Sequence, residues 1–177
     1  MVGVFPYPES VMISPEVLWT MADAPICGRM HATAAQLLGA AGDTVLTFGA
    51  VDYDTASALT ASTGAFVIPV SGVYLIKGSI KINAVTTAAA ITHRLRIITS
   101  AGTNTLWHGA GEYATSGNPG SQYAMCFWLP AGGTLEWVAN LLGANSYDTY
   151  IGDGTGVNVW ASYRLVSRAE TGYNPGS

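Results

Sequence analysis

The segment over residues 63–76 constrains the fold more than any other part of the chain, because it places a proline between two apolar runs. Pro69 has no backbone N–H to give to a sheet, so a central strand cannot pass through it. Glycines flank the first apolar run on both sides and act as breakers. The pattern therefore predicts a short edge strand over residues 65–68, a turn, and a long strand that begins at Val73.

Apolar and polar residues alternate along most of the chain from Gly28 onward. A period of two is typical of half-buried strands. Many short strands separated by glycine-rich turns favour an all-β sandwich or jelly roll. The alternation predicts strands over residues 29–36, 44–48, 73–83, 91–99, 123–129, 135–141 and 156–166.

The composition is poor in charge and rich in apolar residues. Charged residues make up 10% and apolar residues 49% of the 177 residues, and the formal net charge is −4. Seven scattered basic residues argue against nucleic-acid binding, which needs clustered Lys and Arg. No apolar run approaches the length of a membrane-spanning helix. Because so few charges solvate a monomer poorly, we expect part of the surface to be buried in an oligomer or a larger assembly.

The N-terminal segment differs from the rest, with four prolines and no alternation. Ser14 followed by Pro15 predicts a short capped helix over about residues 15–22. Such a helix is too short to be stable alone, so it must dock on another surface, with Leu18 and Trp19 as its anchors. That surface is either the chain's own domain or a neighbouring subunit. The predicted division is a docking arm over residues 1–28, a head domain over 29–168 and a flexible tail over 169–177.

Catalytic chemistry has little support in the sequence. His31, His93 and His108 fall on separate predicted strands without the spacing of metal ligands. We therefore expect no catalytic residues, no cofactor and no tightly bound metal. Asp148 and Asp153 are weak calcium candidates, but the second also fits a hairpin turn.

Asp52 and Asp54 form a second acidic pair. These carboxylates either contribute to a calcium site or cap a loop by side-chain hydrogen bonds. Cys27 and Cys126 are too few for a disulfide framework, and each is expected to be a small buried side chain. A bridge between the two cysteines stays open.

A loop with Tyr147 and Tyr150 contains aromatic side chains suited to binding a glycan or a protein. Trp107 and Tyr113 are the other aromatic residues that could contribute to a binding surface at the tip of the domain. The same residues could instead pack onto their own domain, and the sequence leaves both readings open.

Several of these pieces occur in an order that resembles the globular head of the complement-component-one-q and tumour-necrosis-factor superfamily. The last predicted strand is rich in aromatics over residues 160–165, as in that family. The turn that contains Leu129, Ala131 and Gly132 fits in part, although Gly133 replaces an acidic residue. The spacing that carries most of the resemblance consists of Thr63, Gly64, Phe66, Pro69, Gly72 and Tyr74.

The resemblance implies a ten-stranded jelly roll that assembles as a tight homotrimer. The first, third, sixth and last strands would then face the threefold axis. Strands that are apolar on both faces agree with this, because they need a second partner surface. The residues predicted to line the trimer interface are Tyr74, Phe127, Trp160 and Tyr163.

The predicted function is that of a non-enzymatic, trimeric structural component of a bacteriophage virion, either a minor tail or tail-tip protein or a capsid-decoration protein. Met1 stands directly before the arm, and neither a secretion signal nor a collagen stalk is visible. The expected partners are a second and third copy of the chain, phage capsid or tail proteins bound through residues 1–28, and a host-surface glycan or protein. The expected location is the virion, assembled in the host cytoplasm. The alternative is a secreted or surface-displayed trimer resembling a lectin or a cytokine.

Overall fold

The computed structural model describes residues 25–40, 42–83, 86, 89–109, 112–143, 145–150 and 158–168. Within these residues the chain is built from strands and turns, and there is no helix long and apolar enough to cross a membrane. The strands are β1 (Cys27–His31), β2 (Leu37–Leu38), β3 (Gly42–Val45), β4 (Ala50–Asp54), β5 (Leu59–Thr60), β6 (Ala65–Val67), β7 (Gly72–Lys81), β8 (Ala89–Thr99), β9 (Gly102–His108), β10 (Glu112–Ala114), β11 (Gly120–Leu129), β12 (Thr134–Leu142), β13 (Tyr147–Asp148) and β14 (Trp160–Arg168).

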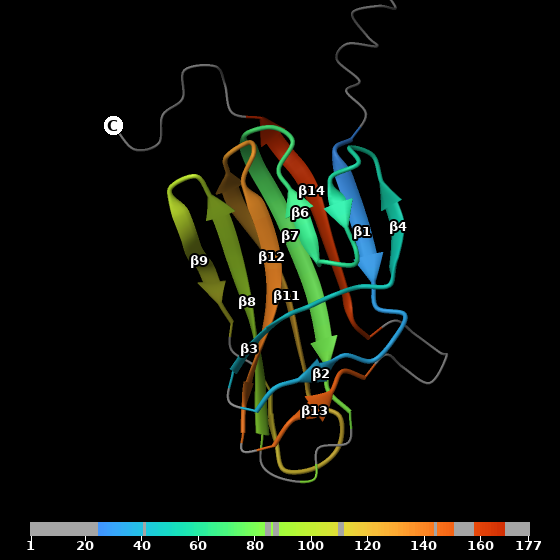
Figure 1. Ribbon diagram of the computed structural model, residues 1–177. Helices are drawn as coiled ribbons and strands as arrows, with labels where there is room; N and C mark the ends of the chain where they lie inside the picture. The colour runs from blue at the N-terminus through green and yellow to red at the C-terminus, as the bar shows by residue number, and fades with distance from the viewer. Residues whose placement is uncertain are drawn as a thin grey trace, which may run out of the picture.

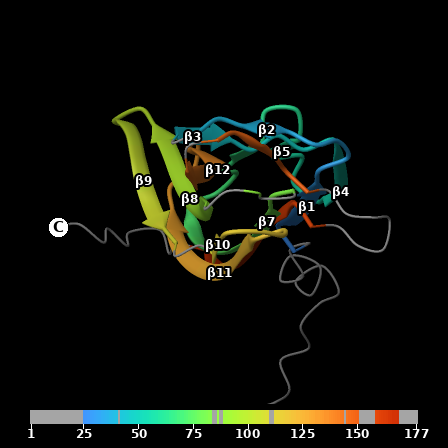
Figure 2. The ribbon, with the colours of Figure 1, turned by 90° about the horizontal axis from the view of Figure 1, so that it is seen from below.

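Two antiparallel sheets face each other across a shared core (Figure 1). The five-stranded sheet has the order β11-β7-β14-β1-β4, and the seven-stranded sheet has the order β10-β8-β12-β6-β5, with β3 also on β12 and β9 also on β8. Figure 2 shows the sandwich from below, with β12 on one side and β7 and β11 on the other. Strands β13 and β2 form a small separate sheet at one end of the molecule.

Aromatic side chains join the two sheets. Phe66 of β6 stacks on Tyr163 of β14, with ring centroids 3.9 Å apart. Tyr74 of β7 meets Phe66 edge-on at 5.5 Å, and its hydroxyl donates to the carbonyl of Val70 at 2.7 Å. Buried aromatic pairs of this kind stabilise a core beyond the area that they remove from water.

The predicted alternation is confirmed on the long strands. Tyr74, Ile76 and Ile80 of β7 point into the core, as do His93, Leu95 and Ile97 of β8. On β12 the predicted stripe of Leu135, Trp137, Ala139 and Leu141 is buried throughout. The edge strand, turn and long strand around Pro69 appear as β6 and β7. The all-β sandwich expected from the sequence is therefore present.

The strand boundaries differ from the prediction in several places. The described residues form fourteen strands rather than the ten implied by the resemblance, and β2, β5 and β13 have two residues each. The first strand ends at His31 rather than at residue 36, because the chain then leaves the five-stranded sheet and β2 pairs with β13.

The predicted arm lies mostly outside the described residues, and β1 already begins at Cys27. The predicted helix over residues 15–22, its anchors Leu18 and Trp19, and the tail over residues 169–177 also lie outside them.

His93 is a basic side chain enclosed in the core. Its side chain is 0% exposed, and its ring lies edge-on to Tyr123 with centroids 4.9 Å apart. Within the described residues neither ring nitrogen has a hydrogen-bond partner. Burial lowers the pKa of His93 to about 3, since the charged imidazolium would lose its hydration.

This environment predicts acid sensitivity of the fold. The folded pKa lies below the ordinary value of 6.5, so the unfolded chain takes up the proton first as the pH falls. The free energy of unfolding should be highest above about pH 6.5 and fall by up to about 1.4 kcal/mol per pH unit toward pH 3. Urea unfolding of wild type and His93→Leu at several pH values measures this contribution.

The variant keeps every carboxylate of the wild type, so the difference between the two pH profiles isolates the histidine. We expect His93→Leu to lose part of the pH slope. Equal slopes for the two proteins would show that His93 does not control acid unfolding.

Candidate functional site

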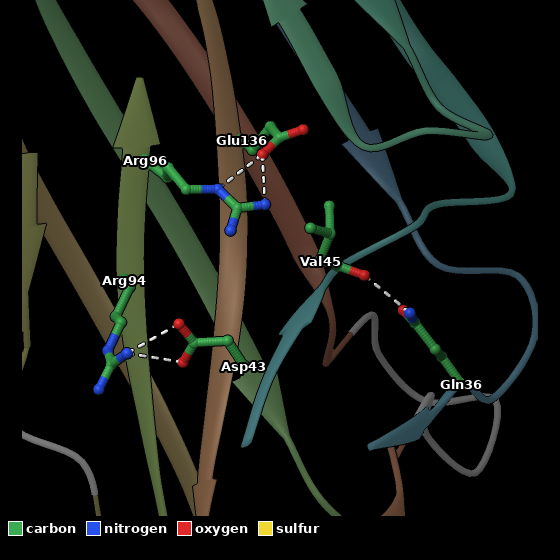
Figure 3. A network of polar contacts seen from close by, with 6 residues as sticks. All are labelled: Gln36, Asp43, Val45, Arg94, Arg96 and Glu136. Carbon is green, nitrogen blue, oxygen red and sulfur yellow. Dashed lines mark hydrogen bonds and ion pairs between the residues drawn. The ribbon is translucent and has the colours of Figure 1, made fainter. Parts of the chain in front are cut away.

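The two outer faces of the sandwich differ in how their charges are balanced. On the seven-stranded sheet, Nη1 of Arg94 lies 2.7 Å from both carboxylate oxygens of Asp43, and Arg96 donates to Glu136 at 2.9 and 2.7 Å (Figure 3). Asn140 also donates to Asp43, at 2.7 Å. These paired charges give this face a polar surface that water can solvate.

A further contact holds the edge of the same sheet. The side-chain amide of Gln36 donates to the carbonyl of Val45 at 2.8 Å (Figure 3). The oxygen of that amide accepts the N–H of Thr47 at 3.0 Å. One glutamine thus ties the chain before β2 to the end of β3 and to the residues that follow it, which is a structural role.

The outer face of the five-stranded sheet has a different character. The register aligns side chains in rows across β11, β7, β14 and β1, because each strand alternates with a period of two. Trp128 and Tyr53 on this face are 38% and 49% exposed. One row consists of Cys126, Leu75, Arg164 and Cys27, and the next of Ala124, Lys77, Ser162 and Arg29.

A shallow hollow of about 450 Å³ lies on this face, over β7, β14, β1 and β4. Two of its lining side chains, Lys77 and Arg164, are basic. Neither makes an ion pair within the described part of the chain. The hollow thus combines apolar walls with two unbalanced positive charges. Its lining residues are Pro25, Cys27, Tyr53, Leu75, Lys77, Ser162, Tyr163 and Arg164.

The Asp52 carboxylate is engaged at the edge of the five-stranded sheet. Asp52 lies 3.3 Å from the Nε of Arg29 and 2.7 Å from the Nδ1 of His31, a contact that becomes an ion pair when the imidazole is protonated. The Arg29 guanidinium also lies 5.2 Å from the ring centroid of Trp160. A cation–π contact of this kind attracts the guanidinium to the face of the indole ring.

The Asp54 carboxylate caps a turn, which is one of the two roles expected for it. It accepts the N–H of Leu59 at 2.7 Å and that of Ala56 at 3.3 Å. It also accepts the hydroxyl of Tyr163 at 2.6 Å. Burial first, and then the neighbouring carboxylate, raises the pKa of Tyr163 above its usual value near 10, so this hydroxyl stays protonated and keeps donating.

The structure describes one of the two acidic residues proposed as calcium candidates. Asp148 is exposed in β13, and Asp153 lies outside the described residues. Across the described ranges, no group of three or more His, Cys, Asp and Glu side chains is close enough to hold a metal ion.

The predicted interface residues Tyr74 and Tyr163 require a correction. They are 0% and 2% exposed within the single chain, so they have no side-chain surface left for another subunit. Phe127 is partly buried and packs against the same core, whereas Trp160 lies on the outer face beside Arg29. The reason is strand alternation, because Tyr74, Phe127 and Tyr163 occupy inward positions.

The residues that sequence reasoning missed occupy the opposite positions of the same strands. Leu75 and Lys77 alternate with the core residues of β7, and Arg164 follows the buried Tyr163 on β14. Trp128 alternates with the predicted stripe of β11. The sequence contains the pattern that identifies these outward residues, because an apolar residue between two core-facing residues of a strand must point outward.

Two other predictions about side-chain exposure also differ. Cys126 is exposed and Cys27 is half-buried, so the expectation of two buried cysteines is wrong. Tyr147 is part of the core rather than of an exposed tip, and Tyr150 lies over the Lys81 ammonium at 5.8 Å. The side chains of Trp107 and Tyr113 are outside the described set.

Comparisons with known proteins identify the fold. No family model and no curated protein matches the chain. The chain is similar to the structure of an Eiger TNF from S. frugiperda, with a TM-score of 0.63, 16% identity, and coverage of 85% of this chain and 98% of the other. It is also similar to murine APRIL in a crystal at pH 5.0, with a TM-score of 0.62, 11% identity, and coverage of 80% and 99%.

A third similar structure is the globular domain of a zebrafish complement 1qA protein, with a TM-score of 0.49, 14% identity, and coverage of 81% and 98%. Identities this low show the fold alone. The similarity to the first two structures shows that the chain has the jelly-roll fold of tumour-necrosis-factor-like domains, as the sequence resemblance implied.

The register excludes the Cys27–Cys126 bridge that the sequence left open. Strands β14 and β7 lie between the two cysteines, which places them about 14 Å apart, far beyond the reach of a disulfide. We expect two free thiols per chain when the protein is denatured without reductant, measured by thiol titration and intact mass. An internal bridge, seen as a chain lighter by about 2 Da, would contradict this register.

Proposed function

We propose that this protein is a non-enzymatic module that forms a homotrimer through the outer face of its five-stranded sheet. The contrast between the two outer faces carries the proposal. The seven-stranded sheet pairs Arg94 with Asp43 and Arg96 with Glu136. The five-stranded sheet exposes Tyr53, which lines the hollow, and Trp128, which lies outside it. Both sheets expose aliphatic side chains, and on the seven-stranded sheet these are Val67, Ile98 and Leu142. The two exposed large aromatic side chains among the described residues both lie on the five-stranded sheet, and exposed aromatics are typical of an interaction surface.

A standard interface buries about 800 Å² on each partner, and apolar area contributes roughly 25 cal/mol per Å² before the costs of association. Tryptophan, tyrosine and arginine supply most of the binding energy in typical interfaces, and this face contains all three. The low charge content of the chain also supports burial of part of its surface.

The number of subunits rests on the resemblance of the sequence to trimeric heads. The strands β1, β7, β11 and β14 lie in one sheet, which agrees with four strands turned toward a common axis. The non-enzymatic part of the proposal is supported by the roles of the polar side chains. Asp54 caps a turn and Asp52 contacts Arg29, so both carboxylates serve the fold.

As the setting of the trimer we propose a bacteriophage virion, in a tail or on the capsid, with residues 1–28 contacting the particle. The low charge content and the aromatic residues of that segment, including Trp19, support this setting. Mass spectrometry of purified virions, or the genes beside the coding sequence, would test it. The likeness to an Eiger TNF favours, as a second candidate, a TNF-like binding protein.

If the protein is a trimer, light scattering at micromolar concentration should give a mass of about three times 18.4 kDa. Trp128→Ser should lower this mass, because it removes a large apolar side chain from the proposed contact. Ile98→Ser is a matched control, since Ile98 is 36% exposed but lies on the outer face of the seven-stranded sheet.

We expect the control to keep the wild-type mass, with both variants folded by circular dichroism. A folded wild-type monomer would refute self-association. An equal loss of mass in both variants would refute the choice of face.

A further inference from the structure

The hollow on the outer face of the five-stranded sheet fits a carboxylate. Lys77 and Arg164 both line it, and the described residues place no carboxylate within ion-pair distance of either. Arg29, Arg94 and Arg96 each face a carboxylate, so the two cations of the hollow differ from these arginines. Two adjacent positive charges repel each other unless an anion lies near them.

The chain itself contains a segment of the complementary charge. Residues 1–24 include three acidic residues and no Lys or Arg. Those acids are Glu9, Glu16 and Asp23. By contrast, Asp148 lies in β13, at the end of the molecule opposite the start of β1 (Figure 1). Asp52 and Asp54 flank the lining residue Tyr53, but Asp52 contacts Arg29 and Asp54 accepts the hydroxyl of Tyr163. Within residues 1–24, Asp23 is the acidic residue nearest in sequence to Pro25.

The structure fixes where this segment meets the domain. Pro25 lines the hollow, and its carbonyl accepts the hydroxyl of Thr55 at 2.5 Å. The carbonyl of Ile26 accepts the N–H of Leu165 at 2.8 Å, which extends the pairing of β1 with β14. Two residues span at most about 7 Å, so Asp23 lies within reach of the hollow that Pro25 lines.

We propose that the carboxylate of Asp23 occupies this hollow and pairs with Arg164 and Lys77, which anchors the end of the N-terminal segment next to Pro25 on the chain's own domain and leaves the residues before it to contact the particle. The inference goes beyond the proposed function and does not depend on the number of subunits. The hollow lies over β7, β14, β1 and β4, whereas Trp128 belongs to β11 and lies outside it. Tyr53 belongs both to the hollow and to the proposed contact between subunits, whereas the Trp128 side of the face stays clear of the anchor.

Protease cleavage after Trp19 in the full chain measures whether the segment is anchored. Asp23→Lys and Arg164→Glu should each raise the chymotrypsin cleavage rate about fivefold, the effect of losing one partly exposed ion pair. The charge swap that combines both changes should return the rate to within about twofold of wild type. Matched controls are Lys81→Glu, on the same face of β7 as Lys77, and Asp148→Lys, an exposed acidic residue elsewhere.

We expect both controls to be cleaved at the wild-type rate. The proposal is overturned if wild type is cleaved as fast as the single variants, or if the charge swap is cleaved as fast as they are. Equal acceleration by Lys81→Glu would also overturn it, because any loss of positive charge on the sheet would then suffice. Light scattering on the same samples keeps the two ideas apart, since a monomeric wild type with a protected segment refutes only the trimer.

Discussion

The contact between Phe66 and Tyr163 holds the two sheets of this protein in their relative positions. The rings stack at 3.9 Å across the core, and the Tyr163 hydroxyl donates to Asp54 at 2.6 Å. The same tyrosine therefore ties β14 to the seven-stranded sheet and to the turn after β4. Once Tyr163 points inward, strand alternation turns Ser162 and Arg164 outward. The outward position of Arg164 follows from this one inward side chain.

Close approach of backbone to aromatic rings explains two glycines within the strands. A Cβ on Gly28 would lie 2.5 Å from the Tyr163 ring, and one on Gly78 would lie 2.8 Å from the Tyr123 hydroxyl. Both distances are shorter than a carbon atom allows, so any other residue would displace a ring. Gly28 and Gly78 thus make room for the aromatic side chains that fill the sandwich.

The two sheets differ in how far their positive side chains are paired, because Arg29 contacts Asp52 on the five-stranded sheet but Lys77 and Arg164 make no ion pair among the described residues. Arg94 and Arg96 pair with carboxylates on the seven-stranded sheet, where they make that face polar. Lys77 and Arg164 lie among Leu75, Tyr53 and Cys27 on the other sheet. An apolar surface with unbalanced charges favours association with an acidic or apolar partner, because water solvates its apolar part poorly.

The sequence by itself determined the long strands β7, β8, β11, β12 and β14, the turn at Pro69, and which residues of a strand share a face, because alternation with a period of two is a local property. It did not determine which face of an apolar strand points inward. The sequence therefore predicts Tyr74 and Tyr163 in the trimer interface, although they belong to the core of the single chain. Only the tertiary structure decided this, through the pairing of β14 with both β7 and β1. These pairings join residues far apart in the chain, and no local pattern specifies the row that places Cys27 beside Arg164.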